Sequence, residues 1–363
     1  MDNSKKLKVI IIIVAVTILI VLLLIIPPAL AKQRRLKEIY IDLSDLDPVD
    51  SLFFTELDLF LENNSIDLIN EAESNLYILN GTEISTLENS DLSIKRANLN
   101  SDRSNFIAFN SYVLIADTRW GQSPTKNRGA SISQLNDWLV NLNPSISPSV
   151  IVAGDEEEDF AAFILYLAGE LLEDSSFHQL IDYLHEGNSN NENDSNWLVQ
   201  LEPVLNQINN WRNKGILAAN WTNWDFIALE NTMETGKAPL TFELRSRYKA
   251  MDWNSRFHLE SHPLPMGAGQ NQSILSGQAI VLEEGFGVRA DIHSSFTKKL
   301  QNSAFQETIE EGTNWSPVSI PAKLLNREHR DIVRLYESAT FFNLITTELA
   351  MHPLFERMHI ALR

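Results

Sequence analysis

Several tryptophans stand beside turns and polar residues, where an indole face can bind a sugar. The chain has eight tryptophans. Those with turn-forming or polar neighbours are Trp120, Trp221, Trp224, Trp253 and Trp315. The C–H face of a pyranose ring stacks on a flat aromatic side chain, while nearby Asn, Asp or Arg side chains hydrogen-bond its hydroxyls. For Trp120 and Trp315 two interpretations stay open, namely ligand stacking and packing in the core.

The other tryptophans, Trp138, Trp197 and Trp211, fall on predicted apolar helix faces. We expect them in the core.

The common sequence signatures of enzymes are absent. The chain contains no Gly-x-Ser-x-Gly, no phosphate loop ending in Gly-Lys-Ser/Thr, no His-Glu-x-x-His and no Gly-x-Gly-x-x-Gly after a predicted strand. His178 and His185 lie seven residues apart, a spacing more typical of surface or interface residues than of metal ligands. The sequence therefore predicts a protein that is not an enzyme, with no cofactor and no metal site.

An acidic run, Asp155 to Asp159, precedes a strongly apolar helix predicted over 160–172. Adjacent side chains on a helix point in different directions and do not converge on one ion. Asp155 as N-cap and Glu158 as the partner of a capping box explain the run better, because negative charge is favourable at a helix N-terminus.

The charge balance argues against nucleic acid as a partner. The chain has 29 basic and 48 acidic residues in 363 and no cysteine. Residues 1–37 hold seven Lys or Arg and one Asp, so residues 38–363 carry 22 minus 47, or −25. Such a body repels phosphate backbones. The lack of cysteine excludes disulfides, thiolate metal sites and a lipid-modified N-terminal cysteine.

The N-terminal segment, residues 1–37, is predicted to insert into a membrane. Val9 to Ile26 is an unbroken apolar run between basic residues and a proline pair. Its 18 residues just span a bilayer core of roughly 30 Å. A cleaved signal peptide ending at Ala29-Leu30-Ala31 is the alternative, but the apolar stretch is longer than the usual one. Either outcome places the rest of the chain outside the cytoplasm, on the outer face of the bacterial cell membrane.

The order of the predicted elements indicates an α/β fold. Strands at 38–43, 66–69 and 76–79 enclose a helix at 48–61, so the body opens as β-α-β. A long apolar strand follows at 106–116. Helices dominate from 131 to 236 and again from 294 to 351, where the last predicted helix is 340–351, with short strands between the two regions.

The central block resembles the extracellular solute-binding proteins of ABC importers, of the carbohydrate type. The family's Gly-Ile-Leu, Trp-Asp, Gly-Lys-Ala and Pro-Leu-Pro motifs are matched in order by Trp211–Leu217, Asn223–Asp225, Met233–Thr241 and His262–Pro265. Upstream, 106–120 and 131–137 resemble the crossing strand and the following helix. Downstream, 277–281, 296–301 and 315–318 resemble the closing glycine strand and the last motifs.

The resemblance implies the two-lobed type 2 periplasmic-binding-protein fold, preceded by one N-terminal transmembrane helix. Lobe one would comprise 38–113 plus 263–312, and lobe two 114–262 plus 313–363, with a hinge near 110–117, 261–265 and 314–317. A small polar solute, a sugar or oligosaccharide, would bind between the lobes and be passed to an ABC transporter permease. The alternative is an anchored interaction or sensor module with a degenerate cleft.

The same resemblance implies which residues line the cleft. By position they are Asp117, Arg119, Trp120, Glu243, Arg245 and Trp315. Trp120 would stack on the solute and the charged groups would orient hydroxyls or a carboxylate, although a surface ion pair is an equally good interpretation of Arg245. The chain also departs from the family. Glu243-Leu244-Arg245 stands where many members have Gly-x-Trp, and Ala116-Asp117 where Tyr-Asn is common.

Overall fold

The computed structural model describes most of the chain after residue 105 and three short strands before it. The described residues are 38–42, 55, 58, 59, 62, 67–69, 76–80, 106–121, 123, 132–142, 148–186, 191–264, 273–284, 290–318, 341–344 and 347–363. No helix among them is long and apolar enough to cross a membrane. The predicted anchor, residues 1–37, lies outside the described residues.

The first strands form one end of a mixed sheet. β1 (Glu38–Asp42) pairs in parallel with both β2 (Asp67–Ile69) and β3 (Leu76–Asn80). β3 then pairs antiparallel with the long strand β8 (Ser273–Glu284), which also pairs with β10 (Phe341–Leu344). The three N-terminal strands agree with the sequence prediction.

β4 (Phe106–Asp117) connects this part of the sheet to the rest of the molecule. Its first half pairs with β8 and with β9 (Ser316–Pro317). Its second half, from Tyr112 onward, pairs with β6 (Leu240–Leu244) and β7 (Leu259–Pro263). The path through the sheet is β2-β1-β3-β8-β4-β6-β5, where β5 is Val150–Ile151. The single 12-residue strand β4 therefore pairs with two different sets of strands, β8 and β9 on one side of Tyr112 and β6 and β7 on the other.

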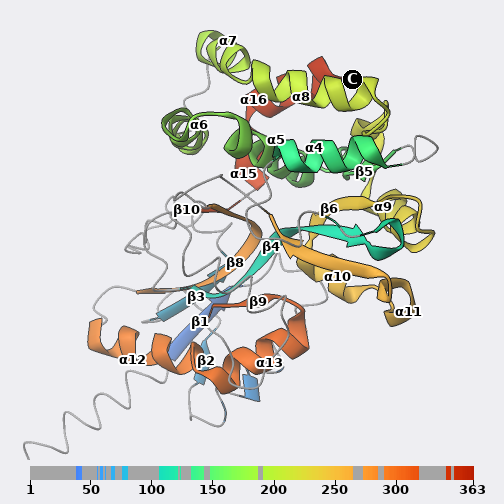
Figure 1. The fold of residues 1–363 in the computed structure, drawn as a ribbon. Helices are drawn as coiled ribbons and strands as arrows, with labels where there is room; N and C mark the ends of the chain where they lie inside the picture. Colours follow the sequence, from blue (N-terminus) through green and yellow to red (C-terminus); the bar gives the residue numbers. More distant parts are fainter. Residues whose placement is uncertain are drawn as a thin grey trace, which may run out of the picture.

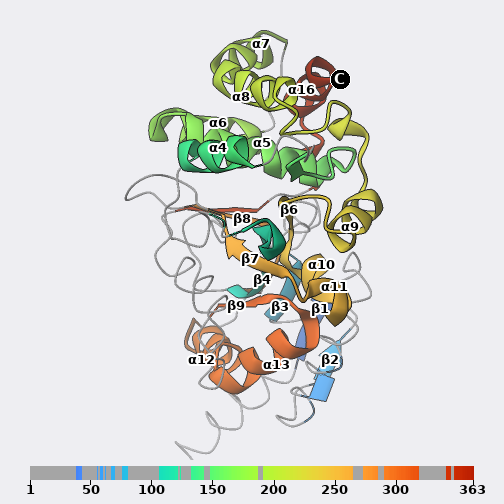
Figure 2. The same ribbon diagram turned by 45° about the vertical axis from the view of Figure 1, so that its right-hand side comes forward.

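Helices cover the two ends of the molecule (Figure 1). The helices at the upper end are α4 (Ile132–Asn141), α5 (Glu157–Leu171), α6 (Asp174–Glu186), α7 (Asn191–Gln200), α8 (Glu202–Asn213), α15 (Thr347–Ala350) and α16 (Pro353–Leu362). The helices at the lower end are α12 (Ala290–Leu300) and α13 (Ser303–Thr313). α9 (Phe226–Glu234), α10 (Arg245–Ala250) and α11 (Trp253–Arg256) lie between them, as the turned view in Figure 2 also shows.

The main core forms around α5, which is apolar on nearly all sides because it is surrounded by other elements. Its residues from Phe160 to Ala168 are all buried. Trp197 and Trp211 join this core, and Trp138 packs against it, as predicted.

Two sequence predictions about helices are wrong. Asp155 is not the N-cap of the helix after the acidic run: the cap is Glu156, whose side chain makes no capping hydrogen bond. The backbone N–H of Asp155 instead donates to the carbonyl of Trp224, so Asp155 lies in the turn just before the N-cap residue Glu156. The helix predicted over 340–351 contains strand β10, because pairing with β8 outweighs local helix propensity.

Candidate functional site

The six predicted site residues fall into two groups along β4. Asp117, Arg119 and Trp120 lie at its C-terminal end, and we call them the strand-end group. Glu243, Arg245 and Trp315 lie near the middle of β4, where Glu243 is opposite Val113, and we call them the junction group. At about 3.3 Å per residue, the four residues from Val113 to Asp117 separate the groups by roughly 13 Å along the strand.

In the strand-end group, Asp117 organises the turn that follows β4. Its Oδ1 accepts from the backbone N–H of Arg119 at 3.0 Å, which caps the short helix η1 (Thr118–Trp120). The Arg119 guanidinium lies across the same carboxylate, with Nη2 2.6 Å from Oδ2. Asp117 is 1% exposed and the Arg119 side chain 39%. The hydrogen bond to Asp117 raises the pKa of Arg119.

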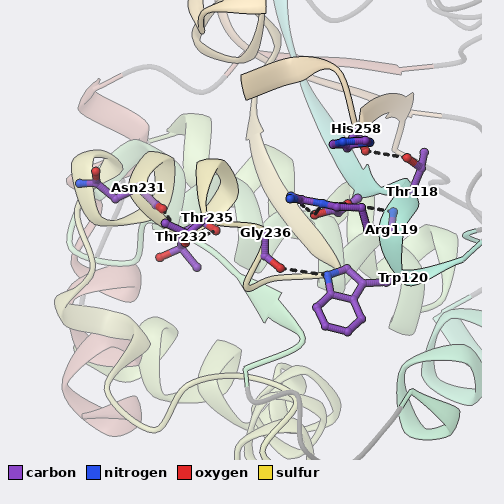
Figure 3. A network of polar contacts seen from close by, with 9 residues as sticks. Thr118, Arg119, Trp120, Asn231, Thr232, Thr235, Gly236 and His258 are labelled. Atoms are coloured by element: carbon purple, nitrogen blue, oxygen red, sulfur yellow. Dashed lines mark hydrogen bonds and ion pairs between the residues drawn. The ribbon is translucent and has the colours of Figure 1, made fainter. Parts of the chain in front are cut away.

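The indole of Trp120 is fixed by a glycine from another element (Figure 3). Its Nε1–H donates to the carbonyl oxygen of Gly236 at 3.2 Å. Gly236 ends α9 with a positive φ of 65°, and a side chain there would collide with the guanidinium of Arg119. Arg119 and Trp120 are thus held side by side with both side chains part-exposed. Of the six predicted residues, these two have the exposure that binding a solute requires in the present conformation.

The junction group is buried. Arg245, the first residue of α10, is fully buried and donates from Nη1 to the carbonyl of Asn314 at 2.6 Å and from Nη2 to Oε1 of Glu310 at 3.0 Å. Trp315, next to Asn314, is 2% exposed. The interpretation of Arg245 as a surface ion pair is wrong, because the pair is internal.

Glu243 belongs to a buried ionic cluster that sequence analysis missed. Arg247 donates from Nη1 to Asp159 at 2.6 Å and to Glu243 at 3.1 Å, and the Tyr112 hydroxyl donates to Asp159 at 3.0 Å. Both carboxyl groups are 3% exposed at the side chain, whereas Arg247 is 33% exposed. The guanidinium also lies 5.5 Å from the centre of the Phe226 ring.

Burial, followed by the charge of Asp159, raises the pKa of Glu243 to about 8. The pKa of Asp159 is also raised, chiefly by burial, while Arg247 opposes the shift. One arginine facing two buried carboxyl groups therefore favours a proton on Glu243 at neutral pH. The one sequence signal for this cluster was the acidic run, in which Asp159 is the member that turns inward.

Around these groups, hydrogen-bond donors and acceptors lie beside aromatic rings, an arrangement that suits the binding of a small polar ligand. Within the described parts of the chain, no three His, Asp or Glu side chains are placed to hold a metal ion. Arg119 of the strand-end group and Arg247, which pairs with Glu243 of the junction group, are part-exposed donors that each stand beside an aromatic ring, Trp120 and Phe226 respectively. Such pairs suit a ligand with apolar faces and hydroxyl edges.

No protein-family model matches this sequence, and no curated protein matches it. Solved structures do match in fold. The bacterial solute receptor AcbH, described as preferring β-D-galactopyranose, superposes with a TM-score of 0.63 at 10% identity, over 90% of this chain and 92% of its own. A family 1 extracellular solute-binding protein from Bifidobacterium longum subsp. infantis gives 0.60 at 10% identity, over 90% and 93%. The maltose-bound MalE3 of T. maritima gives 0.52 at 10% identity, over 90% and 94%.

These structures are binding proteins by their descriptions, and the superpositions cover nearly the whole of each chain. The overall fold is shared over about 90% of this chain. The chain therefore has the α/β fold of the extracellular solute-binding proteins.

Proposed function

We propose that this protein is an extracytoplasmic solute-binding protein, held at the membrane by residues 1–37, that captures a sugar or oligosaccharide for an ABC importer. The observation that carries the proposal is β4, one continuous strand that pairs with β8 and β9 in its first half and with β6 and β7 in its second. In this arrangement two bodies share a strand and bend relative to each other around it, which suits capture of a ligand between them.

The lobes that we propose keep the boundaries given by the family resemblance, 38–113 plus 263–312 and 114–262 plus 313–363. The change of partners at Tyr112 supports a hinge in that region. The neighbours in fold include proteins described as bound to maltose or selective for galactopyranose. Trp120 beside Arg119 would offer a sugar ring an aromatic face and hydrogen-bond donors.

A thermal-shift screen of the full chain in detergent tests this proposal. Sugars and oligosaccharides are compared with amino acids and organic anions, because a ligand at 100 times its Kd adds about 2.7 kcal/mol to the free energy of unfolding. We expect stabilisation by a carbohydrate, and its loss in Trp120→Ala. Trp253→Ala is the matched control, since Trp253 is 66% exposed and lies outside the proposed site.

The burial of the junction group favours a second candidate, an anchored interaction or sensor module on the same fold. Glu243, Arg245 and Trp315 are each 2% exposed or less, and the two charged side chains bind other protein groups. In a degenerate cleft, side chains fill the place of the solute. No stabilisation by any compound of the screen, with the parent chain folded, is the result this second function predicts.

A further inference from the structure

The change of partners in β4 separates two sets of contacts that fix different helices. Gln306 of α13 is fully buried, donates to the carbonyl of Ile107 at 2.9 Å and accepts from the N–H of Val318 at 2.7 Å. α13 is therefore attached to the first half of β4 and to the segment around β9, so 316–318 belongs with this half although the family resemblance assigns 313–363 to lobe two. We call this set of elements the lower unit.

α10 is attached to the other half. It follows β6 directly, its Tyr248 hydroxyl donates to the carbonyl of Leu259 in β7 at 3.1 Å, and its Arg247 pairs with Asp159 of α5. These contacts join α10 to the second half of β4 and to the helical end of the molecule, which we call the upper unit. Figure 1 shows α13 among the orange helices at the lower end and α10 above it.

Arg245 crosses from the upper unit to the lower unit. Its Nη2 lies 3.0 Å from Glu310 of α13, and its Nη1 lies 2.6 Å from the carbonyl oxygen of Asn314. The Arg245 side chain is fully buried and Glu310 is 12% exposed. A charge-assisted pair in such surroundings is screened little by water, so removing either partner costs the other a buried charged contact.

The point about which the two units would bend lies beside this pair. The register between β4 and β8 shifts between Asn110 and Ser111, one residue before β4 changes partners. The Asn110 side chain donates to the hydroxyl of Ser246 at 2.7 Å and accepts from the N–H of Ser246 at 3.1 Å. Irregular strand positions of this kind concentrate bending. Because Arg245 precedes Ser246, it lies next to the position where the two units would bend, and a bend there that separates the units would lengthen the Arg245–Glu310 pair.

We infer that Arg245 is an internal latch: its bonds to Glu310 and Asn314 hold the upper and lower units in one relative orientation when no solute is bound. Arg245 then serves the conformational equilibrium rather than contacting the solute as a cleft residue. The inference rests on the proposed function in one respect, that the two units move relative to each other.

Distances between two spin labels test the latch without any solute. The chain has no cysteine, so Val199→Cys in α7 and Lys298→Cys in α12 are the sole attachment points, and both positions are exposed. The distance is measured in the full chain in detergent by pulsed electron resonance. The variants are Arg245→Met and Glu310→Gln. The matched control is Arg357→Met, which removes a pair with Asp194 at 3.6 Å inside the upper unit.

The expected result is one narrow distance distribution in the parent and in Arg357→Met, and a broader or displaced distribution in both latch variants. Should Arg245→Met fail to fold by circular dichroism, Glu310→Gln decides, because it keeps the shape of the side chain. Identical distributions in parent and folded latch variants would overturn the inference, and so would a parent distribution that is already broad. The proposed function stands or falls separately, by the solute screen.

Discussion

At the scale of single residues, the cluster of Glu243, Asp159 and Arg247 makes stability depend on pH. Burial raises the pKa of Glu243 from its ordinary value of 4.5 to about 8. The folded chain therefore binds a proton at Glu243 more tightly than the unfolded chain does. By linkage, the free energy of unfolding falls as the pH rises from about 4.5 to about 8.

Glu243→Gln keeps the neutral shape and removes this titration. We expect the variant to gain stability relative to the parent as the pH rises from 5 to 8, on the order of 1 kcal/mol or more. Denaturant unfolding at several pH values measures the difference. Glu234→Gln, at an exposed position of α9, is the control. A difference between parent and Glu243→Gln that stays constant across the pH range would contradict the assignment of the proton to Glu243.

The residue scale also shows where sequence reasoning reached its limit. Trp120 and Arg119 are placed side by side and part-exposed, and their roles in binding a solute stay predictions. Arg245 was named for its position in a motif, yet its partners Glu310 and Asn314 lie 65 and 69 residues away along the chain. Composition and spacing carry no information about a contact that tertiary packing alone creates.

At the scale of elements, the turn between β5 and α5 depends on a close approach. Gly154 lies against Trp221, and a Cβ at Gly154 would stand 2.5 Å from the indole ring and 2.7 Å from the backbone oxygen of that residue. Trp221 is 1% exposed and stacks on Phe160 of α5 with ring centres 5.5 Å apart. The indole therefore has no room to retreat.

We expect Gly154→Ala to destabilise the protein by about 1–3 kcal/mol, the usual range for an overpacked core. Gly277→Ala in β8 is the matched comparison, because its Cβ would first meet a terminal methyl group of Leu244, 2.8 Å away, which can change rotamer. Thermal unfolding of both variants measures the effects. Equal losses in the two variants would show that the rigidity of the Trp221 stack is not the cause.

Helices and strands that depend on local sequence patterns could be predicted, whereas those that depend on contacts distant in sequence could not. Amphipathic spacing located α4, and α9 lies within the predicted helical region, where the structure shows Asp225 as its N-cap. The predicted strand 106–116 is β4. Its division between two sets of partners follows from the family resemblance and not from its apolar pattern, which is the same on both sides of Tyr112. β10 was missed because it is a strand only through its parallel pairing with β8, which lies far away in the sequence.

At the scale of the whole molecule, the fate of the predicted anchor, residues 1–37, would decide where the proposed solute-binding protein works. An 18-residue helix is about 27 Å long, close to the roughly 30 Å of a bilayer core. The apolar core of a signal peptide is about 7–15 residues, shorter than this run. If the segment is retained, it would tie the acidic residues 38–363 to the membrane surface. If it is removed after Ala31, those residues would be released.

We expect the chain made in a bacterium to stay in the membrane fraction after alkaline extraction, with the intact mass of 41.2 kDa. Ala29→Gln, which spoils the small-residue site, should change neither result, because an uncleaved anchor does not use that site. Ile18→Arg is the matched change within the apolar run and should lower membrane retention, since an arginine at the centre of a membrane helix costs about 2.5–3.5 kcal/mol on insertion scales. The opposite outcome is a parent protein that lacks its first 31 residues, with full length restored by Ala29→Gln. That result would show a cleaved signal peptide in place of the anchor. Residues 32–363 would then be free in the extracytoplasmic space.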